Sequence, residues 1–207
     1  MRRFLILAHR VPVSGQFTLN DLAGGAGRMD EIARAVSNAF TLSNDLRRDT
    51  EVTLVFTAAP PPAARRMVLV GGRLRYLNPD ERSTAALIKN ALVRSAEHPQ
   101  EFESSPGIRV AGADPIQVLR EFLAAPGTVW LTESGAPIAG YARSVEPFGA
   151  VVSDPYDPTE QEVELLRASG VPPLSVGPRS LRTSQVIDAV HRELDLREAE
   201  ARRATGV

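Results

Sequence analysis

Five consecutive apolar residues, Phe4-Leu5-Ile6-Leu7-Ala8, follow Met1-Arg2-Arg3 at the start of the chain. A continuous apolar run without polar alternation is typical of a parallel strand that helices cover on both faces. The run is shorter than the apolar segment of a signal peptide, and no small-residue cleavage site follows it. No apolar run in the chain approaches the roughly 18 residues of a membrane-spanning helix, so no membrane partner is expected.

Strand-like and helix-like stretches alternate outward from this run, which predicts an α/β fold with a mostly parallel sheet. The dipeptide Gly71-Gly72 separates two apolar stretches, 67–70 and 73–77, and predicts a β-hairpin with a two-residue turn. Asn78 is expected to cap the second helix, with Pro79 at its first position. Asp114-Pro115-Ile116-Gln117 is expected to open a helix as a capping box with proline at the first position, and Asp157-Pro158-Thr159-Glu160 is expected to repeat this pattern. We expect helices at 30–43, 79–96, 114–124, 157–170 and 183–196, and strands at 4–8, 52–57, 67–70, 73–77, 107–110, 128–132, 148–152 and 174–176.

The composition of the 207 residues narrows the classes of function. Apolar residues make up 43%, enough for a substantial core, and charged residues at 24% are ordinary, which excludes wholesale disorder. The chain has no cysteine, so disulfide scaffolds, cysteine nucleophiles and thiolate metal sites are excluded. Its three histidines are far apart in sequence, and we expect no metal site and a cytoplasmic protein.

The net charge of −1 hides an asymmetry between the two halves. Residues 1–100 hold 14 basic and 9 acidic side chains, whereas residues 101–207 hold 10 and 16. A basic half can bind a polyanion such as RNA, although solvated helix faces produce the same composition.

A glycine-rich loop, Gly24-Gly25-Ala26-Gly27-Arg28-Met29-Asp30, leads into the first predicted helix. It matches neither the phosphate-binding loop of nucleotide hydrolases nor the dinucleotide-binding motif. Arg28 offers a planar fork for a phosphate or a base edge, and Asp30 can accept a hydrogen bond or a proton. Asp30 could equally be a first-turn residue that complements the helix dipole.

Two further loops carry unusual polar residues. Arg82 lies near the start of the second predicted helix, where a cation is unfavourable unless it meets an anion. The stretch 174–183 leaves a strand through Gly177-Pro178 and enters the last helix. Ligands of α/β proteins bind in such loops, at the carboxyl ends of strands, although Gly and Pro also punctuate ordinary connections.

Taken together, these segments resemble the TrmY family of tRNA pseudouridine-54 N1-methyltransferases, which belongs to the SPOUT superfamily. The resemblance runs in order over nearly the whole chain, and the longest segment is highly specific. The matching segments are AH at 8–9, FTLNDL at 17–22, GRMD at 27–30, RRD at 47–49, LRYLNPDERSTAALIK at 74–89 and LSVGPRSL at 174–181.

The resemblance implies one SPOUT domain over residues 1–207. In such a domain a parallel α/β sheet is flanked by helices, and the C-terminal segment is threaded into a deep trefoil knot. Residues 1–100 would recognise RNA, and residues 107–200 would form the knotted part that holds S-adenosylmethionine (SAM). The family is also homodimeric, so a second copy is an expected partner, together with tRNA.

The resemblance also implies the residues that hold the methyl donor. They lie in three segments: after a strand at 128–132, in the Ser153-Asp154-Pro155 stretch, and in the loop before the last helix. Ser153 stands where the family has glycine, and Val186 stands where it often has cysteine. The implied donor-binding residues are Leu131, Ser153, Ser175, Val176, Gly177, Pro178, Arg179, Ser180, Leu181 and Val186.

Related rRNA pseudouridine N1-methyltransferases carry an Arg-Pro-Asp element where this chain has Arg28-Met29-Asp30, which implies that Arg28 and Asp30 face the target base, with Arg82 nearby. The expected reaction is methylation of N1 of pseudouridine 54 in tRNA. Asp30 would orient the base and take or relay the N1 proton. Arg28 and Arg82 would stabilise negative charge on the carbonyls or bind flanking phosphates.

Three alternatives stay open at this point. The enzyme could methylate another RNA or a free C-nucleoside. The chain could be an RNA-binding protein with an inactive donor pocket, because Ser153 and Val186 depart from the family. It could also be a purely structural dimeric module, although no feature of the sequence supports that alternative.

Overall fold

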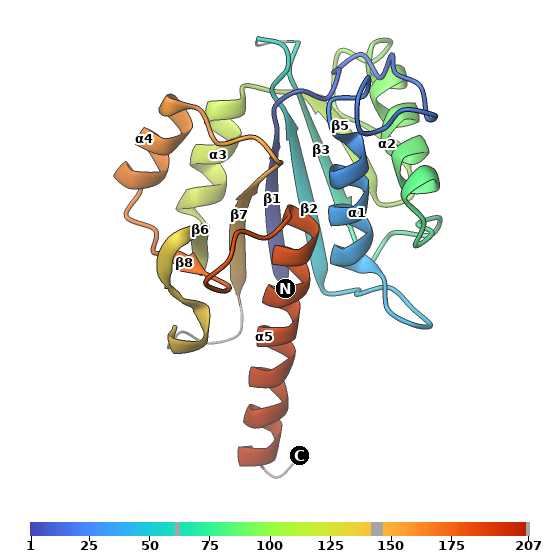
Figure 1. Cartoon of the computed structure of the whole chain (residues 1–207). Coiled ribbons are helices and arrows are strands. Elements are labelled where there is room, and N and C mark those ends of the chain that lie inside the picture. The colour runs from blue at the N-terminus through green and yellow to red at the C-terminus, as the bar shows by residue number, and fades with distance from the viewer. Residues whose placement is uncertain (61–62, 142–146, 206–207) are drawn as a thin grey trace.

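A computed structural model describes residues 1–60, 63–141 and 147–205. Its strands form one eight-stranded sheet in the order β4-β5-β3-β2-β1-β7-β6-β8, with helices on both faces (Figure 1). The elements are β1 Arg2–Ala8, α1 Met29–Phe40, β2 Thr50–Phe56, β3 Arg65–Val70, α2 Glu81–Ser95, β4 Phe102–Ser105, β5 Ile108–Gly112, α3 Pro115–Ala124, β6 Thr128–Pro137, the short 3₁₀ helix η1 Ile138–Gly140, β7 Phe148–Ser153, α4 Glu160–Ala168, β8 Pro173–Ser175 and α5 Thr183–Thr205.

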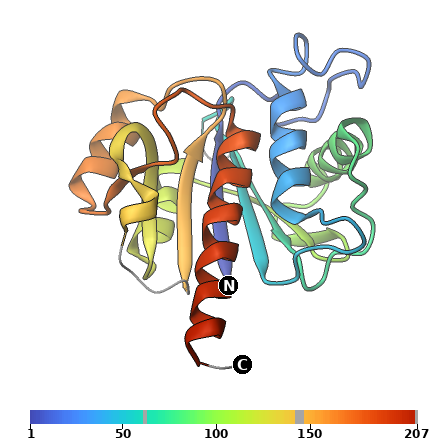
Figure 2. The same ribbon diagram turned by 60° about the horizontal axis from the view of Figure 1, so that its bottom comes forward.

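Strand β1 lies between β2 and β7 and is buried on both faces. Its side chains alternate between two cores: Phe4 and Ile6 pack with α1, α2 and α5, whereas Leu5 and Leu7 pack with α3 and α4. Figure 2 shows α1 and α5 side by side over one face of the sheet. The α/β class and the central parallel position of the first apolar run are confirmed.

The predicted hairpin around Gly71-Gly72 is wrong. Strand β3 pairs antiparallel with β2 and β5, and residues 73–77 form no strand. After the glycines, the amides of Arg73 and Leu74 both donate to the carbonyl of Val70, so the chain turns helically there. Leu74 then inserts into the core. The sheet is therefore parallel from β2 to β8 and antiparallel from β2 to β4.

Three helix starts show how local chemistry sets the boundaries. Asp80, rather than Asn78, caps α2 through a hydrogen bond from the Ser83 amide. Asp114 caps α3 with Pro115 at its first position, as expected, but without a reciprocal capping box. At α4 the expected cap Asp157 is wrong: Thr159 is the N-cap and forms the capping box with Glu162, because its hydroxyl accepts from the Glu162 amide while the Glu162 side chain accepts from the Thr159 amide.

Helix α5 extends past the edge of the sheet to Thr205, beyond the end expected near residue 196 (Figure 1). Arg2, almost fully buried, pairs with Asp195 at 2.6 Å and with Glu198 at 2.7 Å, which holds the outer turns against β1. In the described part of the chain, no helix combines the length and hydropathy that crossing a bilayer requires.

The carboxyl end of β1 is fastened to β7 and α4 by one histidine. The His9 ring contacts Asp154 through Nδ1 at 2.8 Å and Glu162 through Nε2 at 3.0 Å. Burial disfavours the charged ring, but the hydrogen bonds to the two carboxylates outweigh it and raise the pKa of His9 to about 9. His9 is therefore an imidazolium at neutral pH.

This ion pair predicts a pH-dependent stability. Because the pKa of His9 rises from 6.5 to about 9 on folding, the charged ring stabilises the fold fully below pH 6.5. The stabilisation is lost as pH rises through the folded-state pKa, by on the order of 3 kcal/mol. Urea unfolding at several pH values should show this fall in the wild type and not in His9→Gln. The matched control, His98→Gln, changes an exposed histidine and should keep the fall; a fall that persists in His9→Gln would contradict the assignment.

Candidate functional site

A cavity of about 660 Å³ opens at the carboxyl ends of β6, β7 and β8. Nine of the ten implied donor-binding residues line it, and the tenth, Pro178, lies in the same loop without being part of the lining. The structure thus brings together three segments that are distant in sequence. The nine are Leu131, Ser153, Ser175, Val176, Gly177, Arg179, Ser180, Leu181 and Val186.

Hydrogen bonds hold the loops around the cavity in place. The Ser175 hydroxyl donates to the Gly177 carbonyl at 2.7 Å and accepts from the Gly177 amide at 3.2 Å, which closes a tight turn. The Ser180 hydroxyl donates to Glu133 at 2.8 Å, and the Thr183 hydroxyl donates to the Ser153 carbonyl at 2.6 Å. The loop before α5 and the first residue of α5 are therefore joined to β6 and to the last residue of β7.

Strands β6 and β8 meet in an irregular way. Leu174 of β8 is paired both with Leu131 and with Ala136 of β6, so the residues between them bulge around β8. A Cβ atom on Gly135 would lie 2.5 Å from the backbone carbon of Leu174. Only glycine can approach that closely, so this crossing depends on Gly135.

Arg28 connects the cavity with the start of α1. It lines the cavity and has a φ of 69°, an unusual value for a residue with a side chain. Its guanidinium binds Asp30 with both ends, Nε to Oδ1 at 2.9 Å and Nη2 to Oδ2 at 3.0 Å. Gly27 before it is obligatory, since a Cβ there would lie 2.1 Å from the Arg10 carbonyl oxygen.

Asp30 is a buried carboxylate held by two arginines. Arg34, one turn later, donates to Asp30 Oδ2 at 2.6 Å. Burial alone would raise the pKa of Asp30, but the hydrogen bond and charge of Arg28, with the charge of Arg34, outweigh it and lower that pKa. Asp30 is therefore anionic at neutral pH and suited to accept a hydrogen bond.

Glu31 links this helix start to the C-terminal segment, a connection that the sequence did not reveal. Its fully buried carboxylate accepts from the Ser184 amide at 2.8 Å and from the Ser184 hydroxyl at 2.7 Å, at the beginning of α5. Arg34 lies 3.2 Å from the other oxygen of Glu31. Arg34 therefore contacts both Glu31, which holds α5, and Asp30, which binds Arg28 of the cavity wall; Asp30 itself is not in the cavity lining.

Arg82 lies apart from this cavity and is not in its lining. It is exposed and donates to the Leu19 carbonyl and to Asn20 Oδ1, both at 3.0 Å. These bonds hold the loop that precedes the glycine-rich segment. Arg82 thus fixes that loop in this structure and does not join Arg28 and Asp30.

Sequence reasoning missed several residues in the cavity wall, among them Trp130, Glu133 and Tyr156. The Tyr156 ring carries the Arg10 guanidinium over one face, with Cζ 3.9 Å from the ring centre. Trp130 and Glu133 lie on β6 and Tyr156 lies in the loop after β7, and no motif or spacing in the sequence could pair these segments. Among the described residues, no group of three or more carboxylate, imidazole or thiol side chains could hold a metal ion.

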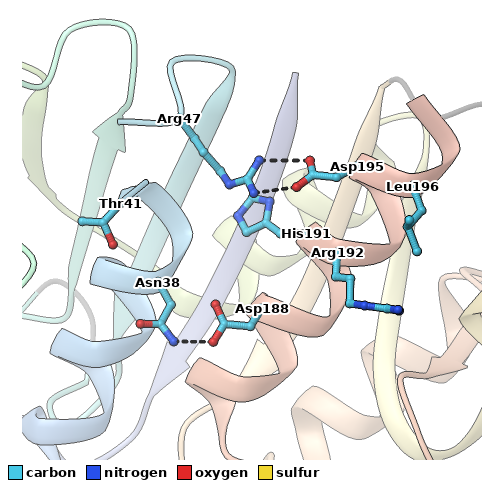
Figure 3. Close-up of a pocket in the computed structure, with 8 residues that line it drawn as sticks. All are labelled: Asn38, Thr41, Arg47, Asp188, His191, Arg192, Asp195 and Leu196. Atoms are coloured by element: carbon cyan, nitrogen blue, oxygen red, sulfur yellow. Dashed lines mark hydrogen bonds and ion pairs between the residues drawn. The ribbon is translucent and has the colours of Figure 1, made fainter. Parts of the chain in front are cut away.

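A second, smaller pocket of about 330 Å³ lies between α1 and α5 (Figure 3). Its polar groups face one another: Arg47 binds Asp195 at 2.7 and 3.0 Å, and Asn38 binds Asp188 at 2.7 Å. Burial and the charges of Arg47 and Arg2 lower the pKa of His191 to about 3, so this histidine is neutral. Apart from the exposed Arg192, the charged groups in its lining are paired within the lining, and no described strand ends there, so it is the weaker ligand site.

The larger cavity suits a SAM-sized ligand. Its volume falls within the range of small-molecule sites, roughly 300–1,000 Å³. Apolar walls come from Leu131, Val176 and Val186, and carboxylates from Glu133 and Asp157 can face cationic groups. The Ser180 hydrogen bond lowers the pKa of Glu133, which keeps that carboxylate charged.

Comparisons with known proteins show the family to which the chain belongs. Residues 1–199 match the family described as "Putative SAM-dependent RNA methyltransferase". The chain is 39% identical over 200 residues to the tRNA (pseudouridine(54)-N(1))-methyltransferase of Methanosarcina mazei, a match that covers 97% of this chain and 93% of the relative. It is 38% identical to the protein of the same name from Haloferax volcanii, over 94% of this chain and 96% of the relative.

Among solved structures, Archaeoglobus fulgidus Nep1 bound to S-adenosylhomocysteine is similar, with a TM-score of 0.61 and 13% identity. The match covers 96% of this chain and 98% of that one and shows a shared fold. Because a family match spans almost the whole chain and relatives align with it nearly end to end, this protein belongs to the family of SAM-dependent RNA methyltransferases that contains the tRNA (pseudouridine(54)-N(1))-methyltransferases.

Proposed function

We propose that the protein methylates N1 of pseudouridine in RNA, at position 54 of tRNA, with SAM as methyl donor. The observation that carries the proposal is the position of Arg28, which lines the donor-sized cavity while binding Asp30. The names of the relatives support the same reaction. Because its substrate is tRNA, we place the enzyme in the cytoplasm.

The chemistry needs one acceptor and accurate positioning. Pseudouridine is joined to ribose through carbon, so its N1 carries a proton, which uridine lacks. SAM bound in the cavity supplies an electrophilic methyl group. Asp30 accepts the N1–H hydrogen bond and orients the base. As N1 bonds to the methyl carbon, the bond between that carbon and the sulfur of SAM would break, S-adenosylhomocysteine would leave with the bonding electrons, and the N1 proton would pass through Asp30 to solvent.

Three arginines have different roles in this reaction. Arg28 turns from Asp30 toward the uracil carbonyl, where negative charge develops in the reaction. Arg34 keeps its 2.6 Å contact and holds Asp30 in place meanwhile. Arg82, exposed and remote from the cavity lining, contacts RNA phosphates rather than the base.

We propose a division of labour within one domain. Residues 1–100 recognise RNA, and residues 107–200 hold the donor as the trefoil knot of the SPOUT fold. The bulge of β6 around Leu174 supports such threading, since the chain there wraps closely around β8.

The proposed reaction is tested by methyl transfer from labelled SAM. A tRNA with pseudouridine at position 54 should be methylated, and a transcript with uridine there should not, because its N1 has no proton to replace. An rRNA fragment and free pseudouridine serve as competing substrates. Equal transfer to the uridine transcript, or preference for either competitor, would refute the assignment.

The role of Asp30 is tested by Asp30→Asn, which removes the anion with little change in shape. We expect kcat to fall by about 10²- to 10⁴-fold, as for loss of a general base, with SAM affinity unchanged in calorimetry. Asp45→Asn, which changes an exposed aspartate in the loop after α1, is the matched control and should keep full activity. Unchanged turnover in Asp30→Asn would exclude the role.

We also propose a homodimer formed through the α1–α5 face. Leu196 lines the pocket of Figure 3 and is 45% exposed, and Leu42, which directly follows the pocket residue Thr41 in the chain, is 48% exposed. Leu196→Glu should give a monomer in light scattering, because burying a carboxylate in an apolar interface is costly. Val93→Glu, which changes an exposed apolar residue on α2, should stay dimeric. A monomeric wild type or a dimeric Leu196→Glu would contradict the interface.

A further inference from the structure

We propose that Tyr156 and Arg10 form a stacking platform for the target nucleotide. An enzyme that modifies a base acts on a nucleotide that has turned out of the RNA stack. The Tyr156 ring stacks on this turned-out base, and Arg10 binds an adjacent phosphate. This inference rests on the proposed function and assigns a positioning role to two residues outside the segments that resemble the family. The platform would lie at the mouth of the donor cavity.

The first support is the geometry of the ring. Tyr156 lines the cavity together with Arg28. The Arg10 guanidinium covers one face of the ring, 3.9 Å from its centre. The opposite face is therefore the one that Tyr156 can offer to a flat ligand, and a pyrimidine stacks on such a face without needing specific hydrogen bonds.

The second support is the rigidity of the platform. The Tyr156 amide donates to Asp154 Oδ1 at 3.1 Å, and the Tyr156 carbonyl accepts from the Ser153 hydroxyl at 2.6 Å. Asp154 also accepts from the His9 amide at 2.7 Å and contacts the His9 ring at 2.8 Å. Arg10 directly follows His9, so one buried carboxylate positions both members of the platform.

The third support is the unused charge of Arg10. Within the described residues, the exposed Arg10 side chain makes no ion pair and no hydrogen bond, and its guanidinium lies over the Tyr156 ring. Its planar fork of N–H donors is free to bind an oxyanion while its face stays on the ring. An RNA backbone presents such an anion next to every base.

The location of the pair favours the base over the donor. The Arg10 carbonyl lies directly against Gly27, which precedes Arg28 and Asp30. Tyr156 and Arg10 thus join the Arg28–Asp30 side of the cavity, where N1 of the target has to arrive. The donor loop before α5 is joined to the cavity through Ser153 and Glu133 instead.

The ring is tested by Tyr156→Leu, which keeps apolar bulk without an aromatic face, against Tyr156→Phe, which keeps the face. We expect the leucine variant to raise KM and the equilibrium Kd for pseudouridine-containing tRNA about 10-fold, while the phenylalanine variant stays near wild type. Calorimetry should give the same SAM affinity for all three proteins, and circular dichroism should confirm that they are folded. Weaker SAM binding with unchanged RNA binding would assign the ring to the donor and overturn the proposal, as would equal losses in both variants.

The charge is tested by Arg10→Gln, with Arg203→Gln near the end of α5 as matched control. Loss of one phosphate contact should reduce the slope of log K for tRNA against log salt by about one, and the control should keep the wild-type slope. An unchanged slope in Arg10→Gln would refute the phosphate contact.

The experiments distinguish failure of the proposed methylation from failure of the Tyr156–Arg10 platform. If wild-type protein transfers no methyl group to pseudouridine-containing tRNA, the proposed function fails. The equilibrium Kd of Tyr156→Leu for the same tRNA then still decides whether the platform binds a nucleotide.

Discussion

The site depends on the charged hydrogen bonds that join His9 to Asp154 and Glu162. Strand β1 is the centre of the sheet, and its last residues are fixed by this contact to the loop after β7 and to α4. The His9 imidazolium and the carboxylates of Asp154 and Glu162 are largely buried. Removal of either the histidine or a carboxylate would therefore leave a buried charge without its partner, which is strongly destabilising. The loop 153–156 and the segment that begins at Arg10 therefore take their positions from one interaction.

A second constraint ties the two halves of the chain together. Glu31 at the start of α1 receives two hydrogen bonds from Ser184 at the start of α5, and Arg34 lies between Glu31 and Asp30. The loop that closes the donor cavity ends where α5 begins. A shift of that loop would be felt by Asp30 through only two side chains, which gives a physical route for coupling between donor and base.

The arrangement explains how a reaction without metal or covalent intermediate can be organised. A carboxylate kept anionic by two arginines is a weak base but a dependable hydrogen-bond acceptor. In the proposed reaction it would select a base that offers an N–H group. The backbone of Arg28, which has a positive φ and follows Gly27 packed against Arg10, places the Arg28 side chain between that acceptor and the cavity.

The sequence by itself determined the features that depend on local patterns. The continuous apolar run of β1 required burial on both faces, Asp114 marked a helix start, and Gly177-Pro178 marked the end of a strand. The hairpin predicted after Gly71-Gly72 was wrong, because a pair of glycines is compatible both with a hairpin and with a helical turn. The burial of Leu74 in the core, which the local pattern does not reveal, goes with the helical turn.

Only the tertiary structure decided which side chains meet. It placed Arg28 in the wall formed by residues 131–186, left Arg82 outside that wall, and brought Arg10 over Tyr156. The physical reason is that sequence periodicity reports which face of an element is buried, whereas the side chains that share a cavity are set by strand order and crossovers, which bring residues more than 100 positions apart to one edge of the sheet.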